Sequence, residues 1–290
     1  MVPFGIIIVA YNPEVGTFYK KIEDYCKITD HVVVVNNGDS LLKLSKICKV
    51  IDLGGNQGIA KAQNVGVNFL AEQKIPFVFL LDQDTKLNNE YFIEMLGEWR
   101  SLSERDSSLG ALSPNIYDRN LKRELSISKL EPIKIKRIFM SDIEGDSLHN
   151  TLPISSGLLT KTSIFQEVGG NDAWMFIDWV DFKFDLDLIS AGYSVYTTKR
   201  VIINHSVGKG VRHRFLWKVL NVSNHSPFRE YYFYRNGIYF LRKNGKRFPQ
   251  LRHYIHHALL TRSLFILYEP QKITRIKRIL KGISDGRRAR

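Results

Sequence analysis

The amino-terminal half of the chain alternates short apolar runs with stretches of helical spacing, and this alternation constrains the fold more than any other feature. Four runs predict strands, because they are short, apolar and followed by polar or glycine-rich residues. They are Gly5–Ala10, His31–Val35, Lys49–Leu53 and Phe77–Leu81. Apolar residues at helical spacing predict one helix from the end of the first strand to about Tyr25, and another over Asn56–Glu72, between the third and fourth strands. The alternation indicates an α/β fold with a Rossmann-like, mostly parallel sheet and helices on both faces.

The pattern is less regular further along. We predict helices at Asn89–Leu102, Ser163–Val168 and Val180–Ser190, strands at Ile154–Thr160 and Tyr193–Ile203, and strands or loop between Leu109 and Asn150. After Asn204 the sequence becomes aromatic, basic and helical. We therefore expect one α/β domain over residues 1–206 and a basic helical extension over residues 207–290.

Charge is divided unevenly between these two parts. Residues 1–206 carry 22 Lys/Arg and 26 Asp/Glu, whereas residues 207–290 carry 20 Lys/Arg and 3 Asp/Glu. Such an asymmetry favours a polyanionic partner for the second part, either anionic lipid or nucleic acid. Nucleic acid ranks last, because the basic part has no recognised nucleic-acid-binding motif.

The end of the basic part has the pattern of an interfacial helix. Apolar residues recur at helical spacing, with lysine and arginine between them. The apolar residues are Ile273, Ile276, Ile279, Leu280 and Ile283, and the basic ones are Lys272, Arg275, Lys277, Arg278 and Lys281. Such a helix is typical of binding to an anionic membrane surface. The alternative is a helix that covers the core of its own domain.

The cysteines and the first residues indicate a cytoplasmic protein. Cys26 and Cys48 show no metal-ligand spacing and no evident disulfide framework. The segment Met1–Gly5 lacks the charged region of a signal peptide. Because no run reaches the roughly 18 uninterrupted apolar residues of a spanning helix, any membrane association is expected to be peripheral.

Asp82-Gln83-Asp84 directly follows the fourth apolar run. Ligands of open α/β sheets gather beyond the carboxyl ends of the strands, so these two carboxylates are expected at the mouth of a crevice. They suit a divalent cation shared with a diphosphate, because Mg²⁺ is usually held by one or two carboxylates plus substrate phosphates. For an isolated Asp-x-Asp sequence, the alternative is a solvated loop.

Clusters of glycine, asparagine or aspartate also end the other three predicted strands. They lie at Ala10–Pro13, Asn36–Ser40 and Gly54–Asn64. Glycine lets the backbone approach a ligand, and a helix N-terminus offers oriented N–H groups to phosphate oxygens. One such cluster is more often a turn, but recurrence at every strand end predicts a nucleotide-binding crevice.

Seven segments together resemble the inverting glycosyltransferases of family 2, which have the fold called GT-A. They are Val9–Pro13, Val34–Gly38, Asn56–Asn64, Leu81–Asp84, Ser155–Leu158, Phe176–Asp181 and His205–Gly208. Within that family the chain is similar to the bacterial rhamnosyltransferases of surface-polysaccharide assembly. The resemblance covers roughly residues 5–240.

The resemblance implies a nucleotide-sugar site, with dTDP-L-rhamnose as the donor. Residues expected to contact the nucleotide are Ala10, Tyr11, Asn12, Asn37, Asn56, Gly58, Ala60, Asn64 and Gln83. Asp82 and Asp84 are implied as ligands of Mg²⁺ or Mn²⁺. His205 either completes the metal shell or contacts the diphosphate, and a purely structural role stays open for it.

Asp178 and Asp181 form a second acidic motif, just before a predicted helix. Inverting transfer needs a general base that takes the proton of the acceptor hydroxyl. By resemblance we assign this role to Asp181, and sugar or acceptor binding to Asp178. Lys183 and Asp187 depart from the family pattern, which has an acidic residue and an arginine there. The alternative is an acidic first turn that favours the helix dipole.

Other side chains near these motifs have two open interpretations each. Trp174 and Trp179 either stack on a sugar or pack in the core. Ser155–Gly157 is expected on a strand beneath the acceptor site. Arg229 lies in an Arg- and Tyr-rich segment and is expected to hold a diphosphate, because guanidinium binds phosphate through two hydrogen bonds.

The implied activity is inverting transfer of L-rhamnose to a polyprenyl-diphosphate-linked glycan, in O-antigen or capsule synthesis at the inner face of the cell membrane. A family 2 enzyme that uses another nucleotide sugar is the alternative within this class. Outside it, the alternative is a non-catalytic polyanion-binding module on a nucleotide-binding fold, since fold alone does not establish function.

Overall fold

The computed structural model describes residues 2–39, 44–119, 122–205, 211–215, 218–222 and 225–289. The chain forms two compact units. The sheet unit comprises Met1–Lys129, Arg137–Phe176 and Val180–His205. The helical unit comprises Leu130–Lys136, Ile177–Trp179 and Ser206–Arg290. Each unit is considered below by itself.

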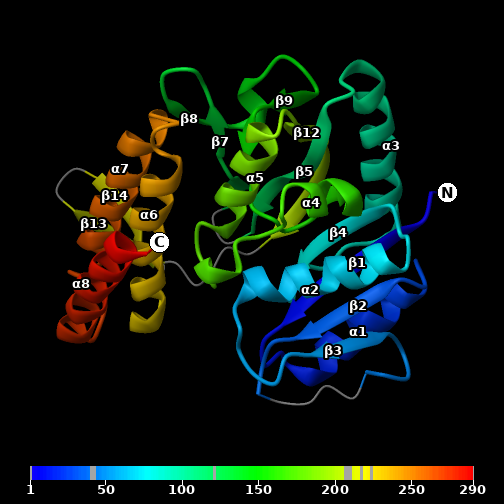
Figure 1. The fold of residues 1–290 in the computed structure, drawn as a ribbon, viewed down its shortest axis with the longest axis horizontal. Coiled ribbons are helices and arrows are strands. Elements are labelled where there is room, and N and C mark those ends of the chain that lie inside the picture. The colour runs from blue at the N-terminus through cyan, green and yellow to red at the C-terminus, as the bar shows by residue number, and fades with distance from the viewer. Residues whose placement is uncertain are drawn as a thin grey trace. The chain divides into compact units, whose positions relative to one another are not determined.

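Four parallel strands at the start of the chain form one side of the main sheet, in the order β3-β2-β1-β4 (Figure 1). They are β1 (Phe4–Ala10), β2 (Val32–Asn36), β3 (Lys49–Asp52) and β4 (Phe77–Asp82). The order reverses around β1, and such a switch point is where open α/β sheets place their ligands. The clusters that follow β1, β2 and β4 therefore meet at one edge.

The sheet continues from β4 through β11 (Leu158–Lys161), β5 (Leu109–Asp118), β12 (Ser194–His205) and β9 (Ser147–His149), with β6 (Arg123–Glu124) beside β5. β11 runs antiparallel to both β4 and β5, and β12 runs parallel to β5. The strands β4, β5 and β12 consequently point the same way, and their carboxyl ends share an edge with that of β1.

Helices cover both faces of the sheet, because successive strand residues point to opposite sides. Ile6 and Ile8 belong to the apolar cluster that includes α1 (Val15–Cys26) and α3 (Asn89–Arg105). Ile7 belongs to a second cluster with α2 (Ile59–Glu72), α4 (Thr162–Glu167) and α5 (Val180–Ser190). The predicted fold class is confirmed.

The segment with the weak sequence pattern folds as the ten-residue strand β5 followed by shorter strands. Besides β5, β6 and β9 it contains β7 (Ile127–Leu130), β8 (Ile135–Ile138) and the 3₁₀ turn η1 (Met140–Asp142). β10 (Thr151–Leu152) follows it and pairs antiparallel with β7. A second 3₁₀ turn, η2 (Ala173–Met175), precedes the acidic motif.

The prediction of a strand over Ser155–Gly157 is wrong. These residues form a turn, and β11 begins only at Leu158. Gly157 has φ +83°, and a Cβ there would lie 2.6 Å from the Tyr91 hydroxyl oxygen. The left-handed conformation of Gly157 and its close contact with Tyr91 prevent regular strand pairing at these residues. The apolar pattern of the sequence did not indicate this turn.

The helical unit contains more than the expected helices. A hairpin of β13 (Val211–Phe215) and β14 (Lys218–Val222) comes first, followed by α6 (Pro227–Asn244), α7 (Gln250–Phe265) and α8 (Lys272–Arg288). α8 packs closely on α6. A Cβ on Gly282 of α8 would lie only 2.5 Å from the Tyr231 carbonyl oxygen of α6. In the part of the chain that the structure describes, no helix is both long and apolar enough to cross a bilayer.

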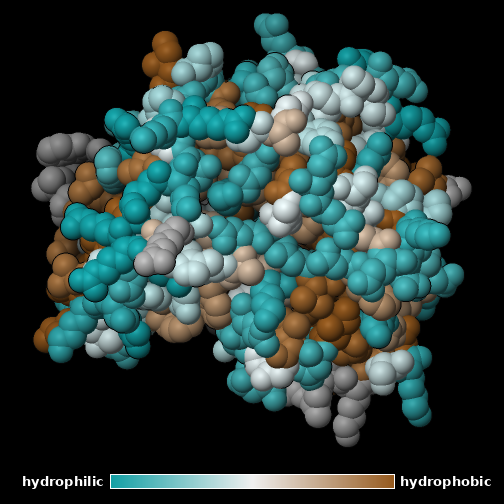
Figure 2. All heavy atoms as spheres, in the orientation of Figure 1, coloured by the Kyte–Doolittle hydropathy of each residue, from teal (hydrophilic) through white to brown (hydrophobic). Residues whose placement is uncertain are grey.

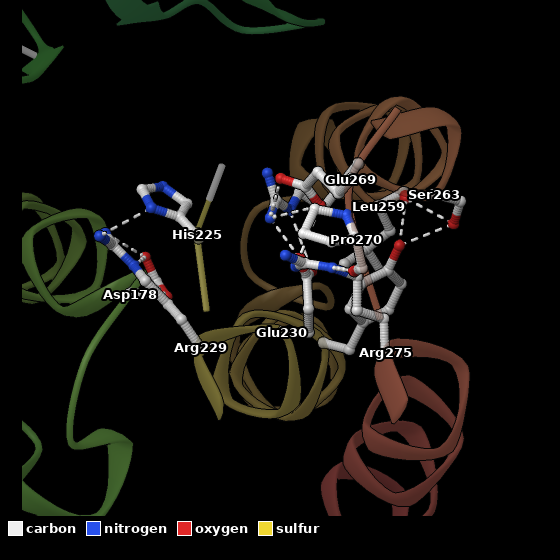
Figure 3. A network of polar contacts seen from close by, with 11 residues as sticks. Asp178, His225, Arg229, Glu230, Leu259, Ser263, Glu269, Pro270 and Arg275 are labelled. Atoms are coloured by element: carbon white, nitrogen blue, oxygen red, sulfur yellow. Dashed lines mark hydrogen bonds and ion pairs between the residues drawn. The ribbon is translucent and has the colours of Figure 1, made fainter. Parts of the chain in front are cut away.

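Four charged side chains form a cluster in the interior of the helical unit. Arg275 Nη1 lies 2.8 Å from Glu230 and 3.0 Å from Glu269. Arg262 Nη2 pairs with the same two carboxylates, at 3.1 Å from Glu269 (Figure 3). These four residues are at most 6% exposed, and they come from α6, α7, α8 and the segment just before α8. We call them the buried ion cluster.

The predicted two-sided pattern of α8 needs one correction. Arg275, expected on the basic face, belongs to the buried ion cluster, and Ile279 is buried with it. Ile273, Ile276 and Leu280 are instead exposed, at 73%, 47% and 62%. Packing on α6 thus uses one edge of the helix and leaves an apolar stripe outside.

Candidate functional site

The ends of β1 and β4 are joined by a hydrogen bond. The Tyr11 N–H donates to Gln83 Oε1 over 2.7 Å, so the side chain of Gln83 is engaged within the sheet unit. Tyr11 itself is 48% exposed. The hydrogen bond fixes the backbone of Tyr11 at the carboxyl end of β4, and the contact of its ring with a nucleoside stays a prediction.

The ends of β1 and β2 also lie in contact. Asn12 adopts φ +44°, and its Oδ1 accepts a hydrogen bond of 3.0 Å from the Asp39 N–H. A Cβ at Gly38 would lie 2.4 Å from that oxygen, so this position requires glycine. The Asn37 N–H donates to the Ala10 carbonyl over 2.8 Å. Residues from two separate motifs thereby form one surface.

Asn37 and Asn56 link the end of β2 to the start of α2. Asn37 Nδ2 donates to Asn56 Oδ1 over 3.2 Å, and the Gln57 N–H donates to Asn37 Oδ1 over 2.7 Å. The Gly58 N–H also donates to Asn56 Oδ1, at 3.1 Å. These hydrogen bonds of Asn37 and Asn56 fix the conformation of the loop before α2. The side chain of Asn37 is buried in this contact, with 4% of the residue exposed.

The first turn of α2 lies against the start of the acidic motif. A Cβ on Gly58, at φ +86°, would lie 2.6 Å from the Phe176 carbonyl oxygen, and the Ala60 N–H donates to that oxygen over 3.5 Å. Further along α2, Asn64 exchanges two hydrogen bonds of 2.8 Å with the backbone of Asn171. Both ends of its amide are thus engaged within the fold, and its contact with a nucleotide stays a prediction.

Lys21 of α1 lies at the carboxyl end of β4, and the sequence analysis did not identify it as a candidate site residue. It is 8% exposed on α1, and its ammonium group donates to the Gln83 carbonyl oxygen. Burial lowers the pKa of Lys21 to about 8, although Asp84 and Asp82 act in the opposite direction. The only available signal was one lysine beside the apolar positions Phe18 and Ile22 of α1.

Asp82 and Asp84 fit a divalent cation as a pair, but not as a complete cage. Asp82 is half-buried at the last position of β4, and Asp84 is exposed two residues later. Among the described residues no three His, Cys, Asp or Glu side chains gather closely enough to hold a metal. Two carboxylates whose coordination shell is completed by diphosphate and water are the usual arrangement for Mg²⁺. His205 ends β12, and its side chain lies outside the described residues.

Asp178 belongs to the helical unit, where Arg229 holds it. Arg229 Nε lies 3.0 Å from both carboxylate oxygens, and Nη2 lies 2.7 Å from Oδ1 (Figure 3). Asp178 also has φ +63°, which is rare for a residue other than glycine. The guanidinium expected on a diphosphate is therefore paired with a carboxylate, and its phosphate role stays a prediction.

His225 faces the same arginine. Its Nδ1 lies 3.5 Å from Arg229 Nη1. Burial, together with the nearby charges of Arg229, Arg262 and Arg275, lowers the pKa of His225 to about 3. At neutral pH the imidazole of His225, which faces the Asp178–Arg229 pair, is therefore uncharged.

Asp181 belongs to the sheet unit, in the first turn of α5, and is half-buried. One turn on, Asp185 is 1% exposed, and its Oδ2 has no hydrogen-bond partner among the described residues. Burial raises the pKa of Asp185 well above its usual value, and Asp181 and Asp187 add to this effect. The two departures from the family pattern, Lys183 and Asp187, form an ion pair with each other.

The two tryptophans have different surroundings. Trp174 is 41% exposed in η2. Trp179 packs on Phe233, with ring centroids 5.2 Å apart, and donates from Nε1 to the Phe233 carbonyl oxygen over 3.0 Å. Of the two interpretations, packing therefore applies to Trp179, while the role of Trp174 stays open.

Solved structures of glycosyltransferases have the same fold. GalNAc-T7, crystallised with UDP, GalNAc and Mn²⁺, superposes with a TM-score of 0.54 at 12% identity, over 82% of this chain. TarS of S. aureus gives a TM-score of 0.50 at 15% identity, over 71% of this chain. The matches span 51% and 37% of those two proteins. The chain thus has the GT-A fold that its sequence predicts.

One curated protein adds a resemblance at the level of sequence. It is the dTDP-rhamnosyl transferase RfbF of Shigella flexneri, which is 29% identical over 288 residues. The match covers 97% of this chain and 94% of the relative. No family model matches the chain. The predicted resemblance to GT-A glycosyltransferases, and among them to a bacterial rhamnosyltransferase, is confirmed.

Proposed function

We propose that this protein is an inverting, metal-dependent glycosyltransferase that moves L-rhamnose from dTDP-L-rhamnose to a lipid-linked glycan of a bacterial surface polysaccharide. The observation that carries the proposal is the similarity to a dTDP-rhamnosyl transferase over nearly the whole length of both chains. The polar residues gathered beyond β1, β2 and β4 support it, because they line the switch point of the sheet.

In the proposed reaction the acceptor hydroxyl oxygen bonds to the anomeric carbon as the bond from that carbon to the dTDP oxygen breaks. Asp181 takes the hydroxyl proton, since Asp178 has both carboxylate oxygens engaged by Arg229. Asp82 and Asp84 would hold Mg²⁺ or Mn²⁺, which offsets the negative charge on the departing diphosphate. Tyr11 and Asn37 would orient the nucleoside.

The metal and the donor are tested together. We expect Asp84→Ala to abolish transfer and weaken dTDP-rhamnose binding in calorimetry, with an unchanged far-UV spectrum. A screen of nucleotide sugars, read by mass spectrometry of a synthetic lipid-diphosphate acceptor, identifies the donor. Full activity of the wild type in EDTA would refute the metal dependence. Transfer from a different nucleotide sugar would retain the class and refute rhamnose.

We also propose that the enzyme works on the cytoplasmic face of the cell membrane and binds it through α8. The exposed stripe of Ile273, Ile276 and Leu280 is bordered by the exposed lysines Lys272, Lys277 and Lys281. Figure 2 shows apolar side chains at the surface over α7 and α8, among hydrophilic ones. An apolar stripe between cations matches an interface of acyl chains and anionic headgroups.

Because α8 also supplies Arg275 to the buried ion cluster, point variants are a better test than truncation. We expect Ile276→Ser with Leu280→Ser to lose co-sedimentation with phosphatidylglycerol vesicles, and to keep donor binding. Ile133→Ser is the matched control, since Ile133 is 89% exposed outside α8. Binding should weaken with added salt, because screening shortens the reach of the lysines. Equal vesicle binding by both variants would refute this role of α8.

A further inference from the structure

The backbone just before α5 is strained. Asp178 and Trp179 have φ of +63° and +64°, and neither is glycine. A side chain in this region costs on the order of 1–3 kcal/mol, and such residues persist only where their surroundings hold them. Two successive residues of this kind, in the acidic motif, require a specific restraint.

Helix α6 supplies that restraint from one of its faces. Asn236 Nδ2 donates to the Ile177 carbonyl over 2.6 Å and to the Asp178 carbonyl over 3.2 Å. Asn236 is fully buried. Arg229 and the Phe233 carbonyl, described above, bind the side chains of Asp178 and Trp179. Positions 229, 233 and 236 share a helix face, so α6 contacts three successive residues of the strained segment.

The amide of Asn236 is itself oriented. Arg235 Nε donates to Asn236 Oδ1 over 2.9 Å, so the NH₂ group points to the two carbonyls. Arg235 is 8% exposed, and its guanidinium lies over the ring of Tyr232, 4.7 Å from the centroid. An amide fixed by a buried arginine is a more exact restraint than packing alone, because it distinguishes donors from acceptors.

We propose that Asn236 is a positioning residue for glycosyl transfer: its amide holds the backbone of Ile177 and Asp178 in the conformation from which α5, and with it Asp181, begins. The inference rests on the proposed function, in which Asp181 is the base. Asp181 lies two residues after Trp179, the last residue of the restrained segment. Its backbone is therefore displaced when Asp178 and Trp179 relax to ordinary dihedral angles.

The substitution Asn236→Asp tests this role with little change of shape. It keeps an acceptor for Arg235 but turns the donor that faces the two carbonyls into an oxygen, which repels them. We expect kcat for transfer to fall at least tenfold and toward about 100-fold, the order of loss for a misplacement near 1 Å. KM and Kd for dTDP-rhamnose should stay within about twofold, and so should metal-dependent hydrolysis of the donor.

Two further variants keep the result interpretable. Asn236→Ser retains a shorter donor and should recover part of kcat, which a general packing defect would not allow. Asn244→Asp is the matched control on α6, because among the described residues Asn244 Nδ2 donates to the Phe240 carbonyl of its own helix, over 3.2 Å. It should keep wild-type kcat.

The outcomes separate this inference from the proposed function. If the wild type transfers rhamnose and Asn236→Asp does so equally well, the positioning role is wrong. Parallel losses of kcat and donor affinity in Asn236→Asp and Asn236→Ser would also overturn it, in favour of a structural role. No transfer by the wild type from any nucleotide sugar would instead refute the proposed function.

Discussion

The sheet unit and the helical unit use polar residues in opposite ways. In the sheet unit two large apolar clusters form most of the interior, and the polar residues predicted to bind a ligand follow the strand ends. In the helical unit two arginines and two glutamates lie in the interior. The polar residues at the strand ends of the sheet unit support the proposed ligand site, whereas the four charged residues of the helical unit join its helices.

The acidic motif divides along the same line. Asp178, in the helical unit, has its carboxylate and its carbonyl oxygen bound by α6. Asp181, in the sheet unit, begins α5. Two carboxylates three residues apart thus have different environments, and the role of each in transfer stays a prediction.

The largest expected effect tests that division. Asp181→Asn keeps the shape and removes the proton acceptor, so kcat should fall by roughly 10²–10⁴, the range for general-base assistance. Donor affinity, measured by calorimetry, should be nearly unchanged. Asp178→Asn is the paired variant and should lose less. A larger loss for Asp178→Asn would reverse the assignment of the two residues.

The next effect tests whether the helical unit depends on its interior charges. Arg275→Leu leaves buried Glu230 and Glu269 with one arginine, and breaking a buried pair costs about 3–5 kcal/mol. We expect that loss in urea unfolding followed by circular dichroism. Arg278→Leu, an exposed arginine of the same helix, should change stability by less than about 0.5 kcal/mol. Equal effects would show that the cluster contributes no more than a surface charge.

A smaller effect tests the one acid buried in α5 of the sheet unit. Because the pKa of Asp185 is raised in the folded chain, the folded state binds the extra proton. The contribution of Asp185 to stability should therefore be fully present below the unfolded pKa near 3.9 and fall as pH rises toward the folded value, by up to about 1.4 kcal/mol per pH unit. Asp185→Asn should remove this contribution and raise Tm at pH 7. An unchanged pH profile in Asp185→Asn would contradict the burial argument.

Much of the sheet unit could be predicted from the sequence, because strand and helix periodicity is a local property. β1, β2, β3 and β4 begin and end within a residue of their predicted positions. Ser155–Gly157 could not be placed, since the turn depends on contact between Gly157 and Tyr91, which are distant in the chain. Lys21 was missed for the same reason: only folding brings α1 to the carbonyl of Gln83.

The sequence by itself determined the α/β class, the resemblance to rhamnosyltransferases, and which strand ends carry carboxylates and asparagines, because periodicity and motif are written along the chain. The tertiary structure alone decided what those side chains contact. It pairs Arg229 with Asp178, buries Arg275 while exposing Ile273, and directs the Asn236 amide at the acidic motif. Pairing and burial depend on residues far apart in sequence, and a charged side chain looks the same in a sequence whether it lies in solvent or in a core.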